Sequence, residues 1–120
     1  MRHLICNDNF ITVKMGMKAV RALVDTGSVS TLVSKELADR LRLKVLPLKM
    51  ETLFLVSANG TALEVIGKAE ILINISGLQI PITARVIRHV SHQFILGADF
   101  MRQNQVWYGI VEFNVPLDTL

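Results

Sequence analysis

Apolar and polar residues alternate over several stretches of this chain, and this period of two predicts β-strands. Phe10–Met15 alternates, Gly16 interrupts the pattern and Ala19–Val24 resumes it, so a hairpin is expected there. Two longer alternating stretches meet at Ser76-Gly77 and predict a second hairpin. Their inward-facing residues are expected to be Ala69, Ile71, Ile73 and Ile75, then Leu78, Ile80, Ile82, Ala84 and Val86.

A third hairpin is predicted between these two. Its strands are Thr52–Val56 and Leu63–Ile66, and Gly67 separates it from the strand that follows. The connection contains Asn59-Gly60, and Asn-Gly is a strong signal for a tight turn. A tip of small residues suits a cover that opens and closes over a ligand. The pattern alone favours the simpler interpretation, a plain surface hairpin.

Two short helices are expected among the strands. Ser34 is a suitable N-cap for a helix through Leu43, since Glu36 would lie in its first turn and the following Leu residues share one face. Asp99 is placed to cap a second helix that ends near Asn104. The tail, Val106–Leu120, predicts one or two more strands. The expected fold class is therefore all-β, mostly strands with two short helices.

Composition limits the possible classes of protein. The 120 residues fit a single domain, 1–120, and 51% hydrophobic against 19% charged residues is more apolar than a self-sufficient monomer needs, which predicts a partner chain. The formal net charge of +3 is scattered, so no dedicated nucleic-acid surface is expected. No apolar run reaches membrane-spanning length, and neither a membrane partner nor a signal peptide is expected.

The single cysteine, Cys6, excludes an internal disulfide and a cysteine metal cluster, and predicts a reducing, cytoplasmic location. Cys6 as a nucleophile would need a histidine and an oxyanion partner that the sequence does not place, so a buried small hydrophobe is the preferred interpretation. His89 and His92 form an H-x-x-H pair in a predicted loop without a third ligand nearby, so no metal site is expected.

The strongest candidate for chemistry is the stretch Ala22-Leu23-Val24-Asp25-Thr26-Gly27-Ser28. A carboxylate at the end of an apolar strand costs free energy unless neighbouring groups hold it. Thr26 and Ser28 offer hydroxyls, and Gly27 permits a tight turn and close approach of another backbone. The pattern indicates a carboxylate on a rigid turn at the floor of a cleft, with an ordinary Asx-type turn as the alternative.

A second motif follows about 70 residues later, as Ile95-Leu96-Gly97-Ala98-Asp99-Phe100. The order of the two motifs, with the Ala58-Asn59-Gly60 hairpin between them, resembles the retropepsins, the single-domain aspartic proteases of retroviruses and retrotransposons. The helix-forming residues Ser34–Ala38 and the residue sequence of the second motif, Leu-Gly-Ala-Asp-Phe, are similar to those of gypsy-type LTR retrotransposon proteases. The resemblance covers about residues 10–113 and implies a closed, barrel-like single lobe that is active as a homodimer.

The resemblance also implies a function, an aspartic endopeptidase that cleaves extended peptides, with its own polyprotein as the expected substrate. Each subunit would supply one Asp25, and the pair would activate a water without metal or other cofactor. Thr26 would brace its counterpart in the second subunit, Gly27 would offer backbone to the substrate, and the Ser28 hydroxyl would bond the outer oxygen of Asp25. An alternative is a catalytically silent module that dimerises or binds peptides, but the intact Asp-Thr-Gly-Ser favours the enzyme.

The substrate-binding residues implied by the resemblance are Leu23 and Ile95, which would line apolar subsites, and the flap tip Ala58, Asn59 and Gly60. Two features depart from the viral members of the family. Val29 replaces an acid that they often carry, and the tail after the second helix is longer. Asp99 is not expected to be a second catalytic acid, because it follows its glycine instead of preceding it.

Overall fold

The computed structural model describes residues 2–5, 10–25, 27–48, 54–56, 60–104, 106–107 and 110–113. The described elements, in chain order, are β1 (Arg2–Ile5), β2 (Phe10–Met15), β3 (Lys18–Val24), β4 (Leu32–Ser34), α1 (Lys35–Arg40), β5 (Phe54–Val56), β6 (Ala62–Ile75), β7 (Leu78–Ile87), β8 (Phe94–Leu96), α2 (Ala98–Asn104), β9 (Val106–Trp107) and β10 (Ile110–Phe113).

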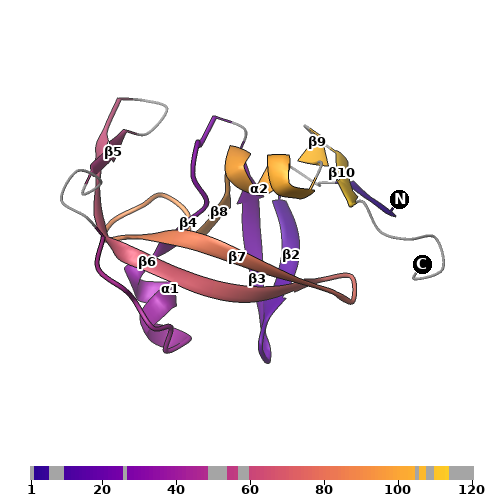
Figure 1. Ribbon diagram of the computed structural model, residues 1–120, viewed down its shortest axis with the longest axis horizontal. Coiled ribbons are helices and arrows are strands. Elements are labelled where there is room, and N and C mark those ends of the chain that lie inside the picture. The colour runs from indigo at the N-terminus through magenta and orange to yellow at the C-terminus, as the bar shows by residue number, and fades with distance from the viewer. Residues whose placement is uncertain are drawn as a thin grey trace.

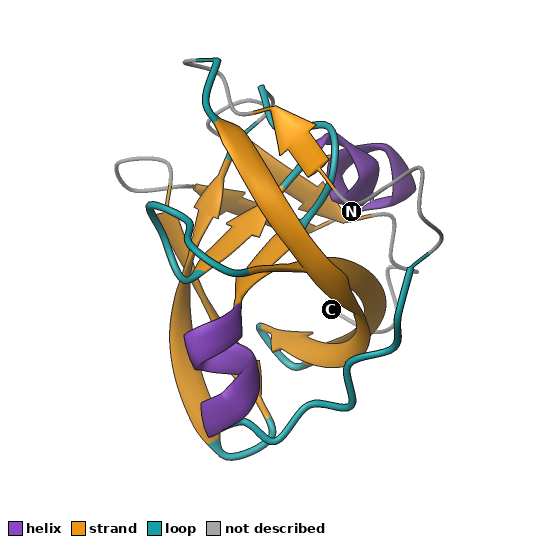
Figure 2. Cartoon of the chain, turned by 90° about the vertical axis from the view of Figure 1, so that its left-hand side faces the viewer, coloured by secondary structure: helices purple, strands orange, loops and turns teal. Residues whose placement is uncertain are grey.

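Six strands close into a barrel in the order β2-β3-β8-β4-β7-β6, and a pairing between Lys14 of β2 and Asn74 of β6 completes the circle. β5 extends the sheet beyond β6. The two helices lie apart, one on the lower and one on the upper side of the barrel in both views (Figure 1 and Figure 2). The predicted fold class, mostly β with two short helices, is confirmed.

The long hairpins fold as the alternation predicts. β2 pairs with β3 around a turn in which Gly16 has a φ of 61°, and β6 pairs with β7 around Ser76-Gly77, where both φ values are positive. Every second side chain from Ala69 to Ile75 and from Leu78 to Val86 points into one core, because successive strand residues face opposite sides of a sheet. Of the predicted inward-facing residues, Leu78 is partly buried and the others are buried.

The expected break at Gly67 is wrong, because β6 runs through it. The register of the β6–β7 pair shifts between Val65 and Gly67, as in a β-bulge, and the strand continues to Ile75. Leu46 pairs with the neighbouring Lys68 through two backbone hydrogen bonds of 2.8 Å. A Cβ at position 67 would overlap the Leu46 carbonyl oxygen. The glycine therefore allows a second chain segment to approach, where the sequence suggested a strand end.

α1 is shorter than predicted. The Ser34 hydroxyl accepts from the Leu37 amide at 3.0 Å, as the N-cap prediction requires, but the helix ends at Arg40 and does not reach Leu43. Arg42 has a φ of 54°, and the Leu43 amide donates to the Ala38 carbonyl at 2.9 Å. This is a Schellman ending in which an arginine occupies the position that glycine usually takes.

β1, β10 and β9 form a separate three-stranded sheet in that order, beside α2 (Figure 1). The tail prediction of one or two strands agrees with β9 and β10, but the sequence analysis did not foresee β1. Arg2 pairs with Phe113, which is far away in the sequence, so no local pattern of residues predicts this pairing. Neither helix in the described part of the chain is long and apolar enough to cross a membrane.

Candidate active site

Asp25 follows directly on β3, at the point where that strand meets β8. The two strands run parallel, with Leu23 beside Ile95 and Val24 beside Leu96, and the Asp25 amide donates to the Leu96 carbonyl at 3.0 Å. The half-buried Asp25 carboxylate accepts a hydrogen bond from the Gly27 amide to Oδ1 at 2.9 Å. The Ser28 amide donates a hydrogen bond of 3.1 Å to the Asp25 carbonyl and so closes the turn. The acid therefore sits on a turn whose backbone is held at both ends.

The Ser28 hydroxyl is placed differently from the expectation. It donates to the Ser30 carbonyl at 2.7 Å instead of bonding Asp25. The chain turns back after Gly27, which brings that carbonyl within reach, while the Gly27 amide already bonds Oδ1 of Asp25. Thr26 lies outside the described residues, and its predicted role remains a prediction.

The Gly97–Asp99 segment is hydrogen-bonded to the Ser28–Thr31 segment, and this contact, here called the clasp, supports the Asp25 turn. The Ala98 amide donates to the Ser28 carbonyl at 2.7 Å, and the Asp99 amide donates to the Val29 carbonyl at 3.2 Å. The two segments are so close that a Cβ on Gly97 would lie 2.5 Å from the Ser30 carbonyl oxygen and 2.7 Å from that of Ser28. Glycine is therefore required at position 97, because a side chain of any other residue would overlap these carbonyl oxygens.

Asp99 connects α2 to the start of β4. The prediction that it caps α2 needs correction, since the helix begins one residue earlier, at Ala98. Its carboxylate accepts from the Thr31 amide at 3.1 Å, from the Thr31 hydroxyl at 2.8 Å and from the Phe100 amide at 2.7 Å. Thr31 is only 1% exposed, and its Oγ1 also accepts from the Gly97 amide at 3.2 Å. The sequence analysis did not assign a role to Thr31. The signal that could have indicated one is a hydroxyl side chain directly before the apolar residues Leu32 and Val33, where a buried hydroxyl needs a hydrogen-bond partner.

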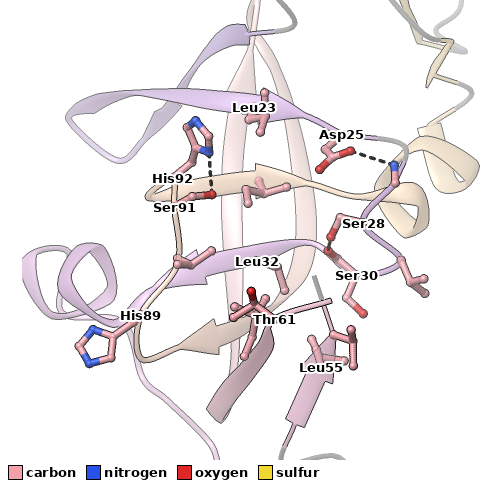
Figure 3. Close-up of a pocket in the computed structure, with 16 residues that line it drawn as sticks. Leu23, Asp25, Ser28, Ser30, Leu32, Leu55, Thr61, His89, Ser91 and His92 are labelled. Atoms are coloured by element: carbon pink, nitrogen blue, oxygen red, sulfur yellow. Dashed lines mark hydrogen bonds between the residues drawn. The ribbon is translucent and has the colours of Figure 1, made fainter. Parts of the chain in front are cut away.

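A cleft of about 800 Å³ opens beside Asp25. Three segments form its walls: the Asp25 turn, the β5–β6 hairpin and the loop between β7 and β8 (Figure 3). Its lining residues are Leu23, Asp25, Gly27, Ser28, Val29, Ser30, Leu32, Leu55, Val56, Thr61, Leu63, His89, Val90, Ser91, His92 and Ile95. Asp25, Gly27, Ser28 and the predicted subsite residues Leu23 and Ile95 are thus brought to one cleft.

The predicted flap hairpin is present, since Leu55 pairs with Leu63 and Val56 with Ala62. Gly60 has a φ of 86° and directly precedes Thr61, which lines the cleft. Ala58 and Asn59 lie outside the described residues, so their assigned contacts are untested.

Half of the residues that line the cleft are aliphatic, and the others include hydroxyl side chains, two imidazoles and Asp25. Buried Leu32, Val65, Ile87 and Ile95 form a second core cluster beneath it, against which Leu23, Leu55 and Leu63 pack. Sequence reasoning did not assign His89, Ser91 or His92 to the cleft, because the loop that carries them reaches it only when the barrel closes. Within the described part of the chain, no group of three or more His, Cys, Asp or Glu side chains could hold a metal ion. This arrangement can bind an extended apolar peptide against a single carboxylate.

Comparisons with known proteins agree with this geometry. The family model described as "gag-polyprotein putative aspartyl protease" matches residues 11–103. Curated protein sequences give no match. The fold is similar to the retroviral protease-like domain of Ddi1 from Leishmania major, with 20% identity, coverage of 92% of this chain and 96% of that one, and a TM-score of 0.65.

Two further solved structures are similar. The EIAV protease in complex with the inhibitor HBY-793 has 18% identity, coverage of 78% of this chain and 85% of its own, and a TM-score of 0.62. A retropepsin-like aspartic protease from Rickettsia conorii has 17% identity, coverage of 92% and 86%, and a TM-score of 0.61. The resemblance that the two motifs indicated is confirmed for family and fold, while the gypsy-type subtype stays a prediction.

The clasp leads to a stability prediction. In Thr31→Val, the Gly97 amide and Asp99 Oδ1 lose a buried partner, so the free energy of unfolding should fall by about 1–3 kcal/mol. Thr83→Val, which changes an exposed threonine of β7, should stay within about 0.5 kcal/mol of the wild type. Urea unfolding at one fixed protein concentration measures both. Equal losses in the two variants would show that the clasp contributes nothing specific.

Proposed function

This chain belongs to the family of gag-polyprotein aspartyl proteases, and on that premise we propose that it is an aspartic endopeptidase that acts as a homodimer. The observation that carries the proposal is the placement of Asp25. Its half-buried carboxylate is held by the Gly27 amide at the floor of a cleft large enough for a peptide. A module that only binds peptides has no need of an ionisable group at that position.

The proposed chemistry needs two carboxylates, and the described cleft contains one. A second copy related by a two-fold axis would supply the other Asp25, as in the established aspartic proteases, where the pair shares one proton because two adjacent charges repel. This requirement is the physical reason for proposing a dimer.

In the proposed reaction, the ionised Asp25 takes a proton from a water molecule as the water oxygen bonds to the scissile carbonyl carbon. The protonated Asp25 of the second copy gives its proton to the carbonyl oxygen. The first Asp25, now protonated, then gives its proton to the amide nitrogen, while the second Asp25, now ionised, takes a proton from a hydroxyl of the tetrahedral intermediate. The C–N bond breaks as the carbonyl group re-forms, and both carboxyl groups return to their starting states. Water is consumed, and a carboxylic acid and an amine are released.

The proposed substrate is an extended peptide segment of the chain's own polyprotein. The cleft lies between a hairpin and the Asp25 turn, so a peptide strand could enter it by β-strand addition, with backbone hydrogen bonds to the flap. Leu23 and Ile95 offer apolar contacts for its side chains. A reducing, cytoplasmic setting for this processing is proposed from the single cysteine, Cys6.

The terminal sheet limits how the second copy can approach. Ile110 and Val111 of β10 are paired with β1 on one side and with β9 on the other. Their backbone groups are therefore used within the chain. In the described part of the sheet, Glu112 and Phe113 of β10 pair with β1 but not with β9, so this end of β10 offers an edge, as do the outer sides of β1 and β9. We expect a dimer contact along one of these edges.

The first prediction concerns catalysis. Asp25→Asn should lower peptide cleavage by at least about 10²-fold, the usual minimum for loss of an acid–base group, because an amide cannot take the proton from water. The fold should persist, since the Asn oxygen can still accept from the Gly27 amide. Asp39→Asn removes an exposed carboxylate on α1 and serves as the matched control.

The assay is pepstatin-sensitive cleavage of an unfolded protein at mildly acid pH. If Asp25→Asn still cleaves the protein, Asp25 is not the group that takes the proton from the attacking water. Absence of any cleavage by the concentrated wild type would favour the alternative function, a silent dimerisation or peptide-binding module.

The second prediction concerns the flap. Gly60→Val should lower kcat/KM by about tenfold, because a β-branched residue resists a φ of 86° at a cost of roughly 1–2 kcal/mol and distorts the hairpin tip. Gly77→Val is the matched control, since Gly77 also has a φ of 86°, and an added Cβ meets nothing within 4 Å at either position. The two variants should lose similar stability, and only the first should lose activity. If Gly60→Val and Gly77→Val have equal kcat/KM values, the β5–β6 hairpin is not a lid over the cleft.

The third prediction concerns assembly. Specific activity should rise with protein concentration until the dimer saturates, because a monomer has half of the catalytic pair. Sedimentation velocity, run over the same concentrations as the activity assay, measures the correlation. Thr26→Ala should shift both curves to higher concentration. A monomer that cleaves, or specific activity that is constant across the dissociation range, would contradict the shared-pair mechanism.

A further inference from the structure

The loop between β7 and β8 gives the cleft a polar wall that the proposed reaction does not use. His89, Val90, Ser91 and His92 all line the cleft. The remaining lining residues are aliphatic, glycine or serine and threonine, with the single exception of Asp25. The described cleft therefore has one acidic group and two imidazoles, and in the view of Figure 3 Leu23 lies between His92 and Asp25.

His92 is exposed, yet two contacts orient its ring. Nδ1 lies 3.0 Å from Ser91 Oγ, and the ring packs against Phe10 with centroids 5.6 Å apart and planes inclined by 56°. The Arg21 guanidinium covers the Phe10 ring, 4.5 Å from its centroid. When the imidazole is cationic, Nδ1–H can donate to Ser91, and Nε2–H remains available to another acceptor.

The described ion pairs around this loop involve other groups than the two imidazoles. Arg88, next to His89, is neutralised by Glu64 through a 3.0 Å ion pair. The second described ion pair, Lys35–Asp39, lies on α1 and does not line the cleft. Within the described residues, the contacts of His92 are with Ser91 and Phe10, and neither is a carboxylate.

We propose that His92 forms a subsite for an acidic side chain of the peptide substrate. The inference rests on the proposed function and adds a charge preference to the apolar contacts that the aliphatic lining residues offer. A glutamate of the bound strand accepts a charge-assisted hydrogen bond from Nε2–H, while its neighbours contact Leu23 and Val90. In a two-fold dimer each copy contributes one such loop, so the preference applies on both sides of the scissile bond.

Two other roles for His92 account for less of the geometry. A purely structural histidine would be satisfied by Ser91 and Phe10, but this role does not require the ring to line the cleft. A metal site would need further ligands, and the described residues contain no suitable group of three. Recognition of a carboxylate uses both the orientation of the ring and its position.

The test uses synthetic decapeptides with a central Leu-Phe bond, apolar flanks, and either Glu or Gln at one position within three residues of that bond. Cleavage is measured at about pH 5.5, where glutamate is largely ionised and histidine side chains as a class are largely cationic. At one or more positions the wild type should favour Glu over Gln in kcat/KM by about fivefold, the upper range for a solvent-exposed ion pair.

Variants at position 92 separate recognition from a structural role. His92→Gln should bring the Glu-to-Gln ratio close to one, and His92→Lys should keep it above one because the positive charge is retained. His92→Glu should bring the ratio below one, because the new carboxylate repels the glutamate of the peptide. Lys18→Gln removes a positive charge at the far hairpin of β2 and β3, and it should leave the ratio unchanged.

Binding of the same peptides to Asp25→Asn, followed by fluorescence anisotropy, gives a readout that does not require catalysis. A Glu preference that depends on His92 supports the subsite even if no peptide is cleaved, in which case only the proposed activity fails. Asp25-dependent cleavage with a ratio near one at every position overturns the subsite and leaves the activity standing. A ratio that Lys18→Gln lowers as much as His92→Gln also overturns it, because the effect is then one of net charge.

Discussion

The close approach of the Gly97–Asp99 segment to the Ser28–Thr31 segment is the constraint on which the site depends. Carbonyl oxygens of Ser28 and Ser30 lie where any Cβ at position 97 would be, and the amides that follow the glycine donate to Ser28 and Val29. The buried Thr31 hydroxyl is satisfied from both sides, by Asp99 and by the Gly97 amide. A buried polar group with all its partners stabilises one arrangement strongly, because every alternative leaves a partner unpaired.

This clasp explains why the carboxylate can be placed on a loop and still be held. Asp25 leaves β3 beside β8, so the same strand pair that buries Leu96 in the barrel core also aligns the acid with the clasp. The apolar cluster beneath the cleft is formed by residues of β4, β6, β7 and β8, and two of them, Leu32 and Ile95, also line the cleft. The packing that stabilises the barrel therefore also shapes the wall of the cleft.

Much of the fold was predictable because its signals are local. The hairpins with turns at Gly16 and Ser76-Gly77 follow from a period of two interrupted by turn residues, and the Ser34 cap follows from one side chain and one amide. The errors arise where a distant segment decides. Leu46 approaches β6 at Gly67, and β1 pairs with a strand more than a hundred residues away. Periodicity contains no information about such partners.

By itself the sequence determined the family, the mostly β fold and the acid at position 25, since these depend on residue order, alternation and two short motifs. Only the tertiary structure decided which residues share the cleft with that acid. Closure of the barrel brings the His89–His92 loop to the cleft, joins Thr31 to Asp99, and directs the Ser28 hydroxyl to Ser30. The physical reason is that a side chain's surroundings are set by segments packed against it in space, and these contacts form only when the whole chain has closed around one core.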